Sequence, residues 1–228
     1  MKNLSGCGSI KKLTKNNLAL VLSGGENEKA VRQAVKSVGW VEMRIDQCLE
    51  RRMPLIQTQR PVVHMIGTVR WKKESQNERL DITEQQRLDI YKEILGYVDY
   101  VDVEIKSPIA AEVTKEAKNR HKRVILSYHN FTKTPSLKAL TKIFKEARKL
   151  QPDIIKISTI VGSKNELFTL LDFTCKYSEK FPLVVTPMGV SAIERIMPVY
   201  LGSLFTYVCL GRPTAPGQPS LDFIKKLL

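Results

Sequence analysis

Short apolar runs alternate with stretches of helical spacing along the chain, and this alternation limits the possible folds more than any other feature of the sequence. Runs rich in β-branched residues and bounded by turn residues predict eight strands, which begin near Leu18, Val41, Val62, Tyr100, Val124, Ile154, Leu183 and Leu204. Apolar residues at helical spacing lie between them, notably over 26–38, 83–95, 136–150 and 163–177, and one more helix is expected after the last strand. This order is typical of a parallel sheet.

The number of repeats favours a closed barrel. The runs 153–157 and 183–185 are almost continuously apolar, as expected of strands that are covered on both faces. Eight repeats in 228 residues fit a (β/α)8 TIM barrel better than a doubly wound sheet, which has fewer strands and often a G-x-G-x-x-G first turn that residues 22–25 lack. No shift in composition marks a linker, so we expect a single domain over 1–228, with 1–17 as a short N-terminal extension.

Two of the expected helices carry a recognisable start. Thr83 with Gln86, and Ser163 with Glu166, fit the S/T-x-x-E/Q capping box, in which each side chain accepts a hydrogen bond from a backbone N–H at the helix N-terminus. We therefore expect helices to begin at these two positions.

Charge and composition narrow the classes of partner. The 37 Lys and Arg residues outnumber the 23 Asp and Glu residues, which gives a net charge of +14. The basic residues are scattered in pairs without a long run, so we expect no nucleic-acid partner, although a basic nucleic-acid-binding protein remains the alternative of a different class. No apolar run approaches the roughly 20 residues of a membrane helix, and no membrane association is expected.

Cysteine usage indicates the redox environment. The four cysteines show no C-x-x-C spacing and no dense framework: Cys7, Cys48, Cys175 and Cys209. This pattern indicates reduced thiols and a cytoplasmic location.

Polar residues gather where the predicted strands end, which is where TIM barrels place their chemistry. They are Glu42, Arg44 and Asp46 along the second strand, Arg70 and Glu74 after the third, and His129 near the end of the fifth. Each has a structural alternative: a charged row can be a buried ion network, and a lone histidine is more often a hydrogen-bonded structural residue.

Lys156 is the most informative of the polar residues. It interrupts the apolar run 154–158, and in a central strand its side chain cannot extend far toward water. An unpaired buried ammonium is costly, so the amine is expected to be paired or neutral. A neutral amine, favoured by desolvation and neighbouring cations, is a nucleophile toward ketones, which predicts a Schiff-base lysine.

Several of these segments together resemble the type I 3-dehydroquinate dehydratases of the shikimate pathway of aromatic amino acid biosynthesis. The resemblance extends from about Leu18 to the C-terminus. It rests on Asp102-Val103-Glu104-Ile105, on Ser127-Tyr128-His129-Asn130, on Lys156-Ile157-Ser158-Thr159, on Glu42-Met43-Arg44-Ile45-Asp46, on Thr68-Val69-Arg70 with Glu74, and on Thr214-Ala215-Pro216-Gly217-Gln218.

The resemblance implies a role for each candidate residue. Lys156 would be the Schiff-base lysine, His129 the general acid and base, and Glu74 the carboxylate that orients the histidine. Substrate contacts would come from Glu42, Arg44, Arg70, Arg195, Thr214 and Gln218. The last three are expected at the substrate carboxylate.

One segment departs from the family pattern. Members usually end a Gly-x-x-Ser-Arg motif after the methionine of the seventh strand, whereas this chain has Glu194 before Arg195 and is one residue short after Met188. Arg195 is the residue that corresponds to the carboxylate-binding arginine.

The implied reaction is a syn elimination of water from 3-dehydroquinate, which gives 3-dehydroshikimate through a lysine imine. It implies no metal and no organic cofactor, and the family suggests a homodimer. The nearest alternative is another class I Schiff-base barrel, an aldolase or related lyase. Such an enzyme would need a phosphate-binding loop after the last strands, for which Gly211-Arg212-Pro213 is a poor match.

Overall fold

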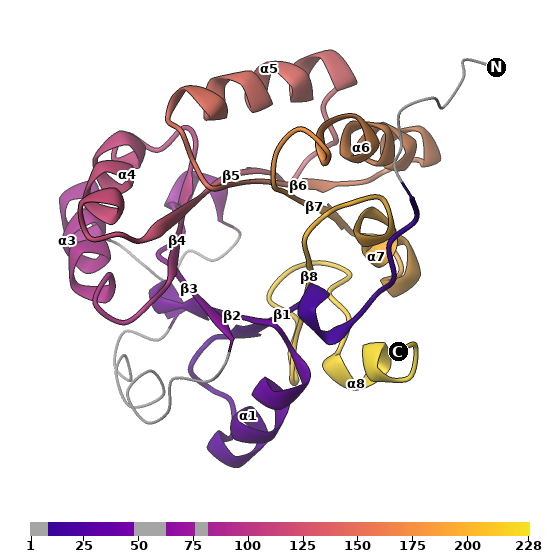
Figure 1. Cartoon of the computed structure of the whole chain (residues 1–228), viewed down its shortest axis with the longest axis horizontal. Helices are drawn as coiled ribbons and strands as arrows, with labels where there is room; N and C mark the ends of the chain where they lie inside the picture. The colour runs from indigo at the N-terminus through magenta and orange to yellow at the C-terminus, as the bar shows by residue number, and fades with distance from the viewer. Residues whose placement is uncertain (1–8, 48–62, 76–81) are drawn as a thin grey trace.

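The computed structural model describes residues 9–47, 63–75 and 82–228, which form a (β/α)8 TIM barrel, and the expected fold is confirmed (Figure 1). All strand pairs are parallel. The strands are β1 (Leu18–Leu22), β2 (Trp40–Arg44), β3 (His64–Thr68), β4 (Tyr100–Glu104), β5 (Arg123–Asn130), β6 (Ile154–Ile160), β7 (Leu183–Met188) and β8 (Thr206–Val208). The strand expected near Val62 begins at His64, and Val62 itself lies outside the described residues.

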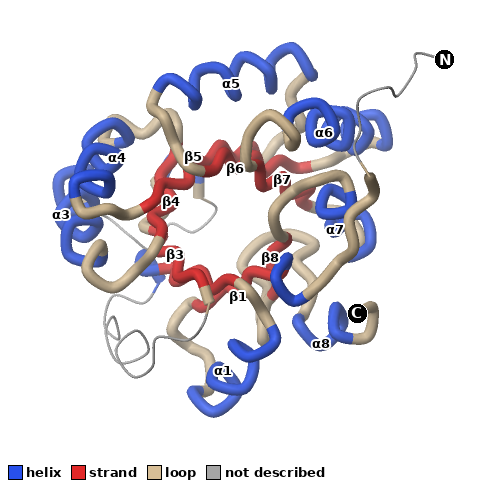
Figure 2. The backbone as a smooth tube through the Cα atoms, viewed as in Figure 1, coloured by secondary structure: helices blue, strands red, loops and turns tan. Residues whose placement is uncertain are grey.

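Helices surround the ring of strands, as Figure 2 shows. They are α1 (Glu28–Ala34), α3 (Glu84–Ile94), α4 (Ala110–Asn119), α5 (Leu137–Lys149), α6 (Lys164–Tyr177), α7 (Ala192–Tyr200) and α8 (Leu221–Lys225). Short 3-10 helices span Lys15–Asn17, Val35–Ser37, Ile45–Gln47 and Lys72–Glu74. The helix expected over 26–38 is therefore α1 followed by a 3-10 turn.

The two predicted helix starts differ in their bonding. Thr83 and Gln86 form the complete capping box of α3. Ser163 caps α6 by accepting a bond from the Glu166 N–H, but the Glu166 carboxylate accepts from Gly162 N (2.6 Å) instead of Ser163 N. Helix α6 thus begins where expected, but the predicted second capping box is wrong in one bond: the Glu166 side chain binds the backbone N–H one residue before Ser163.

The barrel has a seam between β7 and β8. The ladder runs continuously from β7 through β6, β5, β4, β3, β2 and β1 to β8. The two end strands meet through the segment before β8, where Leu204 N donates to Leu183 O (2.8 Å) and Ser203 Oγ accepts from Val185 N (3.0 Å). These contacts explain why β8 begins at Thr206, after the expected position near Leu204.

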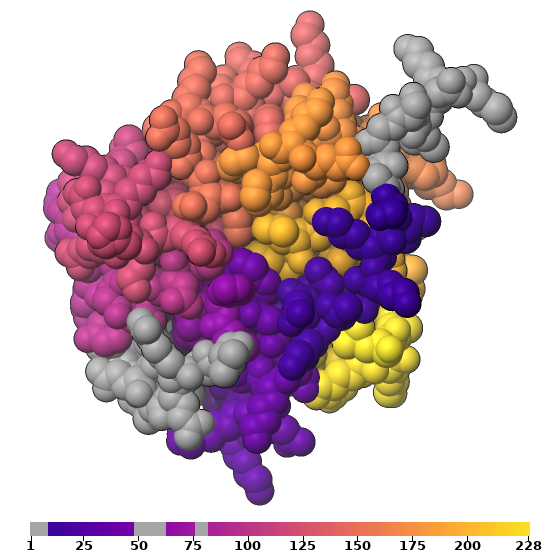
Figure 3. All heavy atoms as spheres, in the orientation of Figure 1, coloured from indigo at the N-terminus to yellow at the C-terminus, as the bar shows by residue number. Residues whose placement is uncertain are grey.

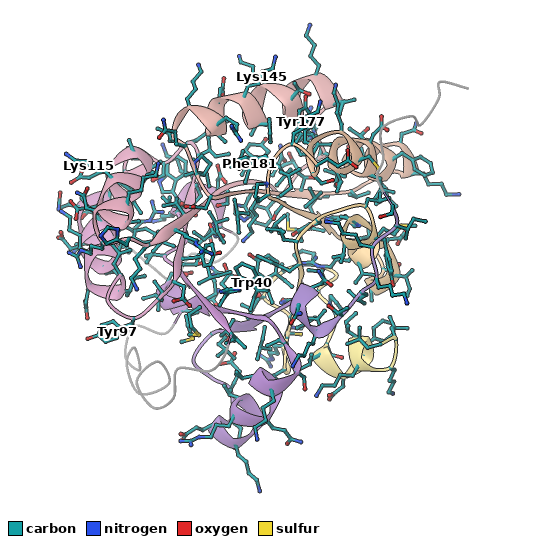
Figure 4. The ribbon with its side chains drawn as sticks, in the orientation of Figure 1. Trp40, Tyr97, Lys115, Lys145, Tyr177 and Phe181 are labelled. Atoms are coloured by element: carbon teal, nitrogen blue, oxygen red, sulfur yellow. The ribbon has the colours of Figure 1, made fainter. Side chains whose placement is uncertain are left out.

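The lower part of the barrel interior is an apolar plug. Side chains from alternate strands fill it in layers, as in other TIM barrels: first Trp40, Tyr100, Ile154 and Phe205, then Ala19, Ile66, Ile125 and Val184. Trp40 lies near the middle of the ring in Figure 4, with its ring centroid 4.7 Å from that of Phe205. The interior becomes polar only above these layers, toward the carboxyl ends of the strands.

The first described residues lie against the last part of the barrel. Lys11 N donates to Tyr200 O (3.0 Å), and Asn17 Nδ2 donates to Leu204 O (2.9 Å). Figure 3 shows this indigo segment beside gold residues from the late part of the chain. No helix among the described residues has both the length and the apolar character to cross a membrane.

Candidate active site

A cavity of about 410 Å³ opens at the carboxyl ends of the strands. All nine residues to which the resemblance assigns a role line it, although they come from β2, β5, β6, α7 and the segments after β3 and β8. They are Glu42, Arg44, Arg70, Glu74, His129, Lys156, Arg195, Thr214 and Gln218. The structure therefore brings the whole predicted set to one place.

Lys156 lies at the floor of the cavity and is 4% exposed. Its Nζ donates to Asp102 Oδ2 (2.8 Å) and lies 3.6 Å from Glu42 Oε1. On another side, Nζ lies 4.4 Å from the centre of the Tyr207 ring. Of the two states expected for a buried amine, the structure shows the paired one, because two carboxylates and an aromatic face surround it.

Asp102 is the main residue that the sequence analysis left without a role. It is fully buried and accepts from Lys156, from Arg70 Nη1 (3.2 Å) and from Ser127 Oγ (2.6 Å). Burial alone would raise the pKa of Asp102, but the cations of Arg70 and Lys156 hold it well below its ordinary range. The period-two row on β4 was a usable signal, since it matches the row on β2.

Arg70 links this floor to the histidine. Its Nη1 donates to Glu104 Oε1 (2.7 Å) and lies 3.5 Å from His129 Nδ1. Burial alone would lower the pKa of Arg70, but Asp102 and Glu104 raise it well above its usual value. Glu104 is also bound by Arg87 Nη2 from α3 (2.6 Å), so a buried ion network supports the site from outside the barrel.

His129 and Glu74 form a second unit at the mouth of the cavity. Glu74 Oε2 accepts from His129 N (2.7 Å) and lies 3.2 Å from His129 Nδ1, as expected of an orienting carboxylate. Burial, with Arg70 and Lys156 nearby, lowers the pKa of His129 well below its ordinary 6.5. Burial raises the pKa of Glu74 to about 7. The imidazole is therefore neutral at pH 7.

The charged row of β2 is both an ion pair and part of the cavity wall. Arg44 donates to Asp46 through Nε (3.0 Å) and Nη2 (2.7 Å). Glu42 accepts from Thr68 Oγ1 (2.7 Å). The guanidinium of Arg44 is thus held in place by a neighbour on the same strand end, while its side chain faces the cavity.

Arg195 faces inward despite the irregular sequence around it. It is 1% exposed, its Nη1 donates to Pro216 O (2.6 Å), and burial lowers its pKa to about 10. Glu194, which replaces the usual serine, forms a capping box with Ser191 at the start of α7. The departure from the family pattern therefore falls on the exposed start of the helix and leaves Arg195 in the cavity.

Gln218 organises the loop after β8. Its Oε1 accepts from Thr214 N (2.7 Å) and from Thr214 Oγ1 (2.9 Å), which closes a short turn over the cavity. The Gln218 amide nitrogen, Nε2, has no hydrogen-bond partner among the described residues.

Four buried side-chain atoms have no hydrogen-bond partner among the described residues, and all four belong to residues that line this cavity. They are Thr186 Oγ1, Arg195 Nε, Tyr207 OH and Gln218 Nε2. Buried polar groups are normally bonded, so their concentration here indicates a surface built for a polar ligand. Within residues 9–47, 63–75 and 82–228, no group of three His, Cys, Asp or Glu side chains is placed to hold a metal ion.

Comparison with known proteins agrees with the geometry. The family model described as type I 3-dehydroquinase matches residues 20–228. A 3-dehydroquinate dehydratase of Thermococcus gammatolerans is 35% identical over 72% of this chain and 75% of its own length. One of Thermodesulfovibrio yellowstonii is 29% identical over 88% of this chain and 89% of its own length.

Solved structures show the same fold. The crystal structure of 3-dehydroquinate dehydratase from Geobacillus kaustophilus HTA426 superimposes with a TM-score of 0.80, covers 98% of this chain and 95% of its own, and is 22% identical. The matched segment includes every strand that contributes to the cavity except the first residues of β1. The chain belongs to the type I 3-dehydroquinase family.

Proposed function

We propose that this cavity dehydrates 3-dehydroquinate to 3-dehydroshikimate, the step of the shikimate pathway that the family's name describes. The substrate is a cyclic hydroxyketone with a carboxylate. The observation that carries the proposal is a single buried amine, Lys156, in the same cavity as a neutral imidazole, His129, that is oriented by a carboxylate.

Lys156 supplies the covalent step. Its Nζ must give up a proton to attack C3 of the substrate, and neutral His129 is a base in the same cavity that can take it. Addition to the ketone followed by loss of water gives an iminium ion. The iminium acidifies the hydrogens at C2, because the electron pair left by the departing proton delocalises toward nitrogen as an enamine.

His129 then serves as base and acid in turn. It removes a proton from C2, and as the enamine electrons return, the C1–oxygen bond breaks and His129 donates that proton to the departing hydroxyl. One group suffices because both bonds break on the same face of the ring. Glu74 stabilises the imidazolium between these two steps, much as a carboxylate does in hydrolase triads.

The upper part of the cavity binds the carboxylate. Arg195 is buried and its Nε has no partner among the described residues, and Gln218 Nε2 is likewise available. A guanidinium and an amide together match the two oxygens of a carboxylate. Glu42, Arg44 and Arg70 face the ring hydroxyls and fix the substrate so that C2 meets His129.

Borohydride trapping tests the proposal. Reduction in the presence of 3-dehydroquinate should add a covalent mass to the peptide that contains Lys156, and Lys156→Met should abolish both the adduct and turnover. Lys138→Met, which changes an exposed lysine of α5, is the matched control and should retain both. An adduct on a different lysine, or turnover by Lys156→Met, contradicts the proposal.

A homodimer and a cytoplasmic location complete the proposal. Exposed apolar side chains on the neighbouring helices α6 and α7, Phe168, Ile193 and Met197, support a contact between two copies. A molar mass of about twice 25.9 kDa in sedimentation supports the dimer, and Phe168→Glu should then shift the mass toward the monomer. The scattered cysteines, which show no C-x-x-C spacing, support the cytoplasmic location. Fractionation of cells tests it.

A further inference from the structure

The layers of the barrel interior determine what surrounds Lys156. Alternate residues on the even-numbered strands place Glu42, Asp102, Lys156 and Tyr207 at one level, and the contacts of Nζ with the other three confirm this level. The odd-numbered strands place the next level above it: Val21, Thr68, Ser127 and Thr186. This upper level contains three hydroxyl groups.

Two of these three hydroxyls have carboxylate partners in the level below. Thr68 Oγ1 donates to Glu42 (2.7 Å), and Ser127 Oγ donates to Asp102 (2.6 Å). Thr186 lies on β7, between the strand of Lys156 and the strand of Tyr207, neither of which supplies a carboxylate. Thr186 is 2% exposed, and its hydroxyl has no hydrogen-bond partner among the described residues.

Tyr207 presents the second unpartnered hydroxyl, on a ring that lies beside the Lys156 amine. The residue is 4% exposed, its ring centre lies 4.4 Å from Lys156 Nζ, and its OH has no partner within the described part of the chain. Burial, with Glu42 and Asp102 nearby, raises the pKa of Tyr207 well above 10, so the group keeps its proton and can donate.

The two sides of the amine are therefore chemically different. Glu42 and Asp102 on β2 and β4 carry negative charge, whereas Thr186 and Tyr207 on β7 and β8 offer neutral donors. When an amine adds to a ketone, the nitrogen lone pair forms the C–N bond and the π electrons move to oxygen, which becomes negative. That oxygen is repelled from the carboxylates and is stabilised beside the hydroxyls.

We propose that the hydroxyls of Tyr207 and Thr186 form the binding site for the ketone oxygen that Lys156 displaces. They donate hydrogen bonds to this oxygen while it becomes an alkoxide and takes a proton from the attached ammonium. The resulting hydroxyl then leaves as water when the iminium forms, with a second proton from His129, the one that His129 took from Lys156 before the attack. The same site receives the water that hydrolyses the product imine. This inference rests on the imine chemistry proposed above.

Tyr207→Phe and Thr186→Val test the inference, since the first removes only the hydroxyl and the second replaces it with a methyl group of similar size. Quenching single turnovers with borohydride measures the rate at which the Lys156 adduct appears. Each variant should slow this rate by on the order of tenfold to a hundredfold, since loss of one preorganised donor typically costs about that or more. A deuterium isotope effect at C2 should fall toward unity, because imine formation becomes slower than proton removal.

Thermal unfolding separates this role from a structural one. Removing a buried hydroxyl that has no protein partner should leave Tm unchanged or raise it. The matched control is Thr174→Val in α6, which removes a buried hydroxyl that donates to Leu170 O (2.8 Å) away from the cavity. This control should lower Tm and leave the rate of adduct formation unchanged.

The outcomes distinguish this inference from the proposed function. If the wild type forms the Lys156 adduct and both hydroxyl variants form it at the wild-type rate, the inference is wrong while the imine mechanism stands. If no variant and no wild-type sample gives an adduct at Lys156, the proposed function itself fails. Slower adduct formation with undiminished Tm supports the oxygen site.

Discussion

At Glu74 and His129, burial moves two pKa values in opposite directions. It raises that of Glu74 to about 7 and lowers that of His129 well below 6.5, so both groups favour their uncharged forms before substrate arrives. The imidazolium needed for the elimination therefore forms only when His129 takes a proton from C2. Glu74 then gains a cation beside it, which favours its charged form at that moment.

Glu74→Gln should change how stability depends on pH. The wild-type carboxyl holds its proton up to about pH 7 when folded, but only to about 4.5 when unfolded, so its stabilising contribution is lost as pH rises from 4.5 to 7. Glutamine does not titrate. As pH rises from 4.5 to 7, the unfolding free energy of the wild type should therefore fall by up to about 3 kcal/mol relative to that of the variant. Urea unfolding at pH 4.5 and 8 measures the change, and parallel pH curves for the two proteins would contradict it.

Arg87 gives a second prediction at this scale. It is 1% exposed and donates to Glu104 (2.6 Å), which in turn accepts from Arg70 in the cavity. Arg87→Met leaves a buried carboxylate with one cation fewer, and should lower the unfolding free energy by about 3–5 kcal/mol. Arg32→Met removes an arginine from an exposed pair with Glu28 and should cost at most about 0.5 kcal/mol. Equal losses in urea unfolding would refute the role of the network.

The sequence identified most of the charged site residues and, through the resemblance, Thr214 and Gln218, but it missed Asp102 and the two hydroxyls of Thr186 and Tyr207. Lys156 was recognisable because a lysine is unusual in a buried strand, whereas His129 received its role through the family resemblance. The row on β4 could have pointed to Asp102, but Thr186 and Tyr207 became meaningful only with the strand order and register, which place Tyr207 beside the amine and Thr186 on the strand between those of the amine and Tyr207. A threonine or tyrosine in a strand is common for packing reasons alone, so no pattern in the sequence marked these two hydroxyls.

Among the elements, the loop after β8 depends on one glycine. Gly217 has φ +72, and a Cβ there would collide with Val190 O in the loop after β7. The two loops are joined by Gly189 N donating to Pro216 O (3.1 Å), and Arg195 donates to the same carbonyl. The conformation of Gly217 therefore helps to hold Arg195 and Gln218 at the proposed carboxylate site.

Gly217→Ala should separate these two loops. A left-handed residue with a side chain costs about 1–2 kcal/mol, to which the collision adds. We expect KM to rise by about tenfold, which corresponds to about 1.4 kcal/mol of lost substrate binding, with a smaller change in kcat. Gly211→Ala is the matched control, since its Cβ would meet nothing within 4 Å and its φ is ordinary. A similar KM in both variants would show that the loop junction does not position the carboxylate site.

The predictability of the elements follows from how each is stabilised. Strands buried on both faces leave continuous apolar runs, so they were found to within a few residues. Helix α4 begins without a side-chain cap, so it lacks the usual start signal, and it was not singled out. Helix α7 does begin with a capping box, Ser191 with Glu194, but it contains Pro198, a residue that argues against a helix interior, and it was not singled out either. The seam at β8 depends on Ser203, whose hydroxyl accepts from Val185 N across the intervening helix α7, a contact that no local pattern marks.

For the whole molecule, the count of strand–helix repeats was sufficient to predict the barrel, because closure of eight parallel strands is a property of the complete set. The net charge of +14 also acts at this scale. Much of it lies on outer helices: Figure 4 shows Lys145 on α5 and Lys115 on α4 pointing away from the barrel. Such charges do not touch the substrate, but their summed field attracts an anion.

This field should make capture of the anionic substrate dependent on salt. The Debye length falls from about 30 Å at 0.01 M salt to about 3 Å at 1 M, so charges on the outer helices are felt at the cavity only when the salt concentration is low. We expect kcat/KM to fall several-fold across this range, whereas kcat, which reports steps after binding, stays nearly constant.

Charge reversal on α5 distinguishes the field of the molecule from the cations inside the cavity. Lys138→Glu, Lys145→Glu and Lys149→Glu together change the net charge by six, from +14 to +8, on exposed positions away from the lining residues. At low salt this triple variant should have a lower kcat/KM than the wild type, and the two curves should converge as salt rises. If the curves coincide at every salt concentration, the attraction comes from Arg195 and its buried neighbours alone, and the outer charge has no part in substrate capture.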